Sequence, residues 1–138
     1  SWLRFLKAMG LSGALCDSMG LGKTIQALVC VAMSHQNGRV KSLIVCPASV
    51  VGHWMREAEK VFVPLKQRCC VFSTTSSLSD ISQADILVAS YAVLRKLGKV
   101  MKEVVWEYCV LDEGHLLRNP RTGRCWSLDW CTCLTLHA

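Results

Sequence analysis

The fold of this chain is constrained most by a glycine-containing loop between an apolar run and a helical pattern. Residues 17–24 read Asp-Ser-Met-Gly-Leu-Gly-Lys-Thr, directly after the apolar run Gly13–Cys16 and at the start of the helical pattern Lys23–Met33. A strand, a glycine-rich turn and a helix in this order are typical of a phosphate-binding loop, in which backbone N–H groups and the helix N-terminus attract phosphate oxygens. The pattern therefore predicts a site for a nucleotide.

Each position of this loop has an expected role. Lys23 is expected to reach the β- and γ-phosphates, and Thr24 to place its hydroxyl on Mg²⁺. Asp17 stands where the strict pattern G-x-x-x-x-G-K-T requires glycine, so a chance Gly-Lys-Thr at a helix start remains the alternative. The residues expected to surround the phosphates before Lys23 are Asp17, Ser18, Met19, Gly20, Leu21 and Gly22.

Apolar runs and helical patterns alternate along the chain. The runs are continuous, as in strands covered on both faces of a parallel sheet, and the order predicts right-handed βαβ units in an α/β layered fold. The expected strands are Gly13–Cys16, Leu43–Cys46, Ile86–Ala89, Tyr108–Leu111 and, more weakly, Cys69–Phe72. The expected helices are Lys23–Met33, Val50–Phe62 and Tyr91–Val100.

Three segments between or beside these elements carry further expectations. The pattern Lys23–Met33 is apolar nearly all round, which predicts a buried helix. Ser73–Gln83 is rich in Ser and Thr and indicates a surface connection. After Pro120 the cysteines and tryptophans crowd together without a period, and the pattern predicts no element there.

Composition narrows the class of protein. The 138 residues suit one domain, and a net charge of +6 from 16 basic and 10 acidic residues is compatible with an anionic partner. The nine cysteines include no C-x-x-C pair and lie partly inside apolar runs, which favours free thiols in a reducing compartment over disulfides or a structural metal. No stretch reaches about 18 consecutive apolar residues, so we expect no membrane span. No secretory signal is visible either.

Two carboxylates follow the last apolar run. Asp112 and Glu113 come directly after Tyr108–Leu111, and ligands of open α/β sheets bind at the carboxyl ends of strands. Asp112 is expected to hold Mg²⁺, and Glu113 to orient and deprotonate an attacking water. A polar strand end that caps the next helix is the alternative, but the phosphate loop in the same chain favours a catalytic role for the two carboxylates. His115 is a candidate coupling residue.

These motifs resemble those of the Swi/Snf-type ATPases, a branch of helicase superfamily two. Asp112-Glu113-Gly114-His115 resembles the DEAH-type box, and residues 17–24 are similar to the nucleotide loop of this group, which tolerates Asp at the first position. Gln26 matches the family habit of Lys-Thr-x-Gln.

Three further stretches resemble family motifs in the right order. They are residues 43–47 with 52–54, residues 88–91, and residues 115–119, where Arg118 replaces a lysine. Gly114 together with Gly52-His53-Trp54 is most similar to the subgroup that removes TATA-binding protein from DNA. The resemblance therefore implies double-stranded DNA and TATA-binding protein as partners and the nucleus as location.

The resemblance also implies a fold and further site residues. It implies a RecA-like P-loop lobe, a three-layer sandwich with a mostly parallel central sheet, over residues 1–120, followed by an atypical tail at 121–138. ATP and Mg²⁺ are the implied cofactors, and DNA-dependent ATP hydrolysis is the implied activity. The implied DNA-facing residues, whose alternative reading is ordinary turn residues, are Pro47, Ala48, Ser49, Ser90 and Tyr91.

Departures from the family pattern set the remaining expectations. The adenine-reading Gln would lie before Ser1, the Thr-Gly-Thr-Pro-like element expected after Asn119 is not found, and Ser18 replaces an acidic residue. We therefore expect a lobe that is incomplete at both ends and not competent without a second RecA-like lobe, which carries the arginine finger.

Two other functions remain open at this point. A truncated chain could be a non-catalytic nucleotide-binding or protein-interaction fragment. An unrelated phosphate-loop enzyme, such as a small kinase, would carry an arginine-rich lid, and none is visible in the sequence.

Overall fold

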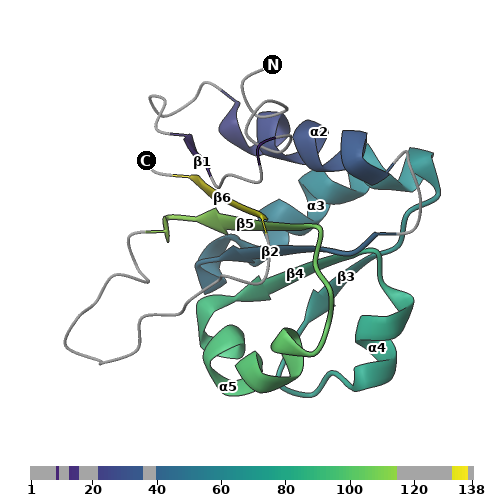
Figure 1. The fold of residues 1–138 in the computed structure, drawn as a ribbon, viewed down its shortest axis with the longest axis vertical. Helices are drawn as coiled ribbons and strands as arrows, with labels where there is room; N and C mark the ends of the chain where they lie inside the picture. The colour runs from purple at the N-terminus through teal and green to yellow at the C-terminus, as the bar shows by residue number, and fades with distance from the viewer. Residues whose placement is uncertain (1–8, 10–12, 16–21, 36–39, 115–131, 137–138) are drawn as a thin grey trace.

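One parallel sheet lies between two layers of helices in the computed structural model (Figure 1), which describes residues 9, 13–15, 22–35, 40–114 and 132–136. The strands are β1 (Gly13–Leu15), β2 (Ser42–Cys46), β3 (Cys69–Phe72), β4 (Ile86–Ser90), β5 (Tyr108–Asp112) and β6 (Thr132–Leu136). The helices are α2 (Lys23–His35), α3 (Val51–Phe62), α4 (Leu78–Gln83) and α5 (Tyr91–Lys102), with short 3₁₀ turns η1 (Ala48–Val50) and η2 (Val63–Leu65). The predicted α/β layered fold is confirmed.

The strand order places the ends of distant segments together. The order is β1-β6-β5-β2-β4-β3, and every pair is parallel. Because parallel strands end at the same edge of a sheet, the carboxyl ends of β2, β4 and β5 lie side by side there. Cys46 pairs with Ser90 in this register, and Val45 pairs with Leu111.

Alternation along the strands divides the core into two clusters. Successive strand residues point to opposite faces of the sheet, so Ile44, Val88 and Val110 pack under α2 and α3, whereas Leu43, Leu87 and Cys109 pack against α4 and α5. All six are fully buried. Figure 1 shows the two helical layers on either side of the sheet. The apolar runs of the sequence are thus covered on both faces, as a parallel sheet requires.

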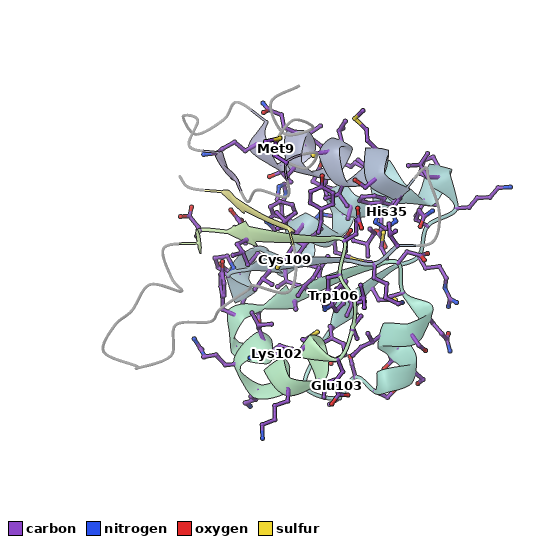
Figure 2. The ribbon with its side chains drawn as sticks, in the orientation of Figure 1. Met9, His35, Lys102, Glu103, Trp106 and Cys109 are labelled. Atoms are coloured by element: carbon purple, nitrogen blue, oxygen red, sulfur yellow. The ribbon has the colours of Figure 1, made fainter. Side chains whose placement is uncertain are left out.

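Helix α3 buries one face and joins α2 to the sheet. Its inward residues Trp54, Ala58 and Phe62 are spaced four apart and at most 1% exposed. The ring of Phe62 meets His35 edge-on at 5.7 Å between centroids. The His35 ring nitrogens lie 2.9 Å from Ser42 Oγ and 3.3 Å from Gln67 Oε1. This places His35 between the end of α2 and the sheet (Figure 2).

The connection predicted at Ser73–Gln83 is wrong in its second half. Residues 78–83 form α4, whose N-terminus carries a capping box: the Asp80 N–H donates to Ser77 Oγ, and the Ser77 N–H donates to Asp80 Oδ2 at 2.6 Å. Such a box satisfies two N–H groups that a helix start leaves without partners. At the other end, Lys41 Nζ donates to the carbonyl oxygens of Ile81 and Ser82 at 2.7 and 2.9 Å. These end contacts stabilise a helix too short to show a period.

The prediction that α2 is buried all round is also wrong. Ile25, Val29 and Met33 follow one another at four-residue spacing and are 42%, 46% and 39% exposed. The opposite face, with Leu28 and Val31, is fully buried. The helix therefore covers the sheet with one face and leaves an apolar row outside. Neither α2 nor any other described helix is long and apolar enough to cross a membrane.

The strand β6 was not predicted from the sequence. Its backbone lies between β1 and β5, with Leu134 paired to Gly13 on one side and to Val110 on the other. The division of the chain at residue 120 stays a prediction, but residues 132–136 are a strand of the central sheet.

Replacing Phe62 by alanine should strongly destabilise the chain. Phe62 is fully buried against His35 and the sheet, and Phe→Ala in a core costs about 3–5 kcal/mol. The free energy of unfolding measured in urea checks this. Val63→Ala is the matched control, because its side chain is 59% exposed and surface changes stay within about 0.5 kcal/mol. Equal losses in the two variants would contradict the packing described.

Candidate nucleotide site at the carboxyl edge of the sheet

The first turn of α2 begins at a glycine in a left-handed conformation. Gly22 has φ +71°, which side-chain-bearing residues rarely adopt, and its carbonyl accepts the first helical bond from the Gln26 N–H at 3.0 Å. Lys23 and Thr24 are therefore the first two helical residues, and both are half-buried. The free N–H groups and partial positive charge of a helix start suit phosphate oxygens. The predicted loop residues 17–21 lie outside the described residues.

The backbone turns sharply where β5 ends. Asp112 is the last residue of the strand, and Glu113 follows with φ +53°, in the left-handed region that non-glycine residues avoid. Residues held in such conformations cost about 1–3 kcal/mol and cluster at functional sites. Both carboxylates are half-buried, and Gly114 after them is buried. His115 lies outside the described residues, so its coupling role stays a prediction.

Two aromatic side chains hold Asp112. The indole Nε1–H of Trp54 donates to Asp112 Oδ2 at 2.8 Å, and the phenol of Tyr91 donates to the Asp112 carbonyl oxygen at 2.6 Å. Trp54 belongs to α3 and Tyr91 opens α5, so the two rings reach the strand end from opposite layers. Sequence reasoning did not assign Trp54 to the site. One feature of the sequence could have indicated it: an indole N–H needs a hydrogen-bond acceptor when it lies on the buried face of a helix.

The surroundings of Asp112 keep nearby groups protonated. Burial, and then the negative charge of Asp112, raise the pKa of the Tyr91 phenol far above its usual range, so its hydroxyl remains a donor. The same two causes raise the pKa of the Cys46 thiol to about 12. The Tyr91 phenol and the Cys46 thiol therefore stay neutral beside Asp112.

The predicted DNA-facing residues separate into two kinds. Ala48 and Ser49 are exposed, and Pro47 is half-buried at the start of η1. Ser90 and Tyr91 are only 9% and 7% exposed. The Ser90 hydroxyl accepts from the Val93 N–H at 3.3 Å and caps α5. The side chains of Ser90 and Tyr91 thus both make hydrogen bonds within the chain, and their contact with DNA stays a prediction.

The described residues fit a magnesium nucleotide. The start of α2 and the carboxyl ends of β2, β4 and β5 lie on the same side of the sheet (Figure 1). Thr24 offers a hydroxyl oxygen and Asp112 a carboxylate, one of whose oxygens, Oδ1, accepts no hydrogen bond from the described residues. In nucleotide sites Mg²⁺ is held by one or two carboxylates together with the phosphates. The arrangement is therefore suited to binding and polarising a phosphate chain.

Comparison with known proteins gives a family and relatives. A model described as SNF2-related domain matches residues 1–129. The chain is 40% identical over 139 residues to the TATA-binding protein-associated factor mot1 of Aspergillus fumigatus, and 38% identical over 139 residues to MOT1 of Saccharomyces cerevisiae. Each match covers 88% of this chain and 7% of the relative. The chain thus spans a small part of the length of these curated relatives.

A solved structure shares the fold over nearly the whole chain. The Sulfolobus solfataricus SWI2/SNF2 ATPase core in complex with dsDNA matches with a TM-score of 0.80 and 33% identity, covering 98% of this chain and 29% of that chain. A second solved structure, the Sulfolobus solfataricus SWI2/SNF2 ATPase core domain, matches with a TM-score of 0.78 and 33% identity, covering 99% of this chain and 28% of that chain. The predicted RecA-like fold is confirmed by this likeness.

The Cys46 thiol should resist alkylation in the folded chain. With a pKa of about 12, about one thiol in a thousand is ionised at pH 9, and only the thiolate reacts. Iodoacetamide labelling at pH 9, read by peptide mass spectrometry, should modify Cys46 slowly in buffer and rapidly in urea, where its ordinary pKa returns. Labelling in buffer at the rate seen in urea would contradict the buried, neutral thiol.

Proposed function

We propose that this chain, which belongs to the family of SNF2-related domains, is the ATP-binding lobe of a motor that hydrolyses ATP and moves on double-stranded DNA. One observation carries the proposal. The Asp112–Glu113 pair ends β5 in a left-handed turn, at the sheet edge where α2 opens with Lys23 and Thr24. A carboxylate pair at the sheet edge where a helix begins with Lys-Thr suits nucleotide hydrolysis.

Each residue has a proposed part in this chemistry. Lys23 binds the β- and γ-phosphates, and residues 17–22 surround them with backbone N–H groups. Thr24 and Asp112 hold Mg²⁺, which when bound neutralises charge on the phosphates. Glu113 orients the attacking water and takes its proton. Gln26, exposed in the first turn of α2, is proposed to bind the nucleotide. His115 is proposed as the coupling residue.

Contact with DNA is proposed for the turn after β2. Ala48 and Ser49 are exposed beside Pro47, and the net charge of +6 favours an anionic partner. A structural neighbour at 33% identity is an ATPase core in complex with dsDNA. Contacts to the phosphate backbone of DNA make the affinity dependent on salt and nearly independent of the DNA sequence. Ser90 and Tyr91 contribute by fixing the neighbouring strand end.

The wider role is proposed from the relatives. Several of them are TATA-binding protein-associated factors, so we assign this chain to a nuclear motor that displaces TATA-binding protein from DNA. Turnover is proposed to require a second RecA-like lobe; this chain covers 29% of the solved ATPase core. The second candidate is a nucleotide-binding or protein-interaction unit without turnover of its own. ATP turnover by the 138-residue chain alone would exclude that candidate.

Lys23→Ala should abolish the binding of Mg²⁺-ATP to the purified chain. The change removes the positive charge proposed to face the phosphates. Titration calorimetry measures the affinity, and Lys99→Ala, which removes an exposed lysine of α5, is the matched control. Binding should survive in the control. Unchanged ATP affinity in folded Lys23→Ala would refute the loop assignment.

Glu113→Gln should keep ATP binding and stop hydrolysis in a protein that contains both lobes. Glutamine retains the shape of the side chain but cannot take a proton, and a general base contributes about 10²–10⁴-fold in rate. The readout is phosphate release with DNA present, with Glu103→Gln, an exposed carboxylate at the end of α5, as the control. Full turnover in Glu113→Gln would remove Glu113 as the base.

A further inference from the structure

Asp112 points toward the layer of α2 and α3. Tyr108 and Val110, four and two residues earlier in β5, pack in the cluster beneath those helices. Because strand side chains alternate between faces, Asp112 belongs to the same face. Its carboxylate therefore emerges from the sheet directly beside the inward face of α3.

The indole of Trp54 lies on that inward face and donates its hydrogen bond to the Asp112 carboxylate. Trp54 is 1% exposed, and its Nε1–H, the only donor of the side chain, lies 2.8 Å from Asp112 Oδ2. A hydrogen bond to a charged acceptor is about twice as strong as a neutral one. Packing around the ring fixes the donor, so the donor fixes the rotation of the carboxylate and directs Oδ1 away from α3.

Tyr91 fixes the same residue through its backbone from the opposite side. Its ring packs in the cluster beneath α4 and α5, and its hydroxyl lies 2.6 Å from the Asp112 carbonyl oxygen. That carbonyl immediately precedes Glu113, whose φ is +53°. The bond therefore holds the peptide at which the chain turns from the strand into the left-handed conformation.

We propose that Trp54 and Tyr91 are positioning residues that orient the Asp112 carboxylate for Mg²⁺ in the nucleotide site. The inference rests on the proposed function, since it concerns the metal that accompanies ATP. A carboxylate that is already oriented binds a metal without the cost of being ordered, and loss of a hydrogen-bond partner behind a ligand typically costs about 10–100-fold in metal affinity.

The test is the Mg²⁺ dependence of binding of a fluorescent ATP analogue to the chain. Trp54→Phe and Tyr91→Phe each remove one donor and keep an aromatic ring. Both should raise the Mg²⁺ concentration for half-maximal binding, by about 10-fold or more for Trp54→Phe, and leave binding in EDTA unchanged. The matched control is Trp106→Phe, because Trp106 is 3% exposed and donates its own indole N–H to the Met101 carbonyl at 2.7 Å, away from Asp112.

Outcomes separate this inference from the proposed function. If the wild-type chain binds the analogue and both folded variants keep the wild-type Mg²⁺ dependence, the positioning role is wrong and the nucleotide site stands. If Trp54→Phe unfolds, Tyr91→Phe decides. If the wild-type chain binds no analogue, the proposed function fails and the metal role fails with it.

A readout without nucleotide tests the contact itself. In the ¹⁵N spectrum of the wild-type chain, the Trp54 indole N–H signal should move when Mg²⁺ is added and when Asp112 is changed to Asn, whereas the Trp106 signal should stay in place. If the chemical shift of the Trp54 indole N–H stays the same after both changes, the proposed link between the indole and the carboxylate is wrong.

Discussion

The common direction of the strands is the constraint on which the rest of this structure depends. Parallel strands cannot be joined by tight turns, so each return needs a crossing segment, and the helices that make these crossings cover both faces of the sheet. The cost is a set of strands that must be apolar throughout. The gain is that β2, β4 and β5 all end at one edge. Polar residues placed just after the apolar runs are thereby gathered into one site.

Asp112 shows how the three layers act together at that edge. Its carboxylate is held from the α3 side by Trp54, and its carbonyl from the α5 side by Tyr91. A half-buried carboxylate without such donors would lose hydration and receive nothing in return. The Tyr91 bond also holds the peptide that precedes Glu113, whose φ is in the left-handed region. Stability of the core and geometry of the site are therefore carried by the same rings.

The sequence predicted those elements that are long or continuously apolar. The pattern of apolar residues predicted β2, β3, β5 and α3. A continuous apolar run indicates a strand buried on two faces, and an apolar stripe indicates a helix buried on one. Helix α4 is too short for a period, although Ser77 and Asp80 form a capping pattern that could have indicated it. The bond from Trp54 to Asp112 spans 58 positions. No local pattern specifies such a pair, since it arises only when the strand order is known.

The place of β6 has a consequence for how the chain is made. Among the described residues, β1 pairs only with β6, which in turn separates it from β5. A ribosome releases Gly13–Leu15 more than a hundred residues before Thr132–Leu136, so β1 is made well before the strand with which it pairs. Contacts between distant segments form late, and unpaired strands are sites of misassembly. The pairing of β1, which leads into the predicted phosphate loop, therefore has to wait for β6, whereas β2 to β5 can pair earlier.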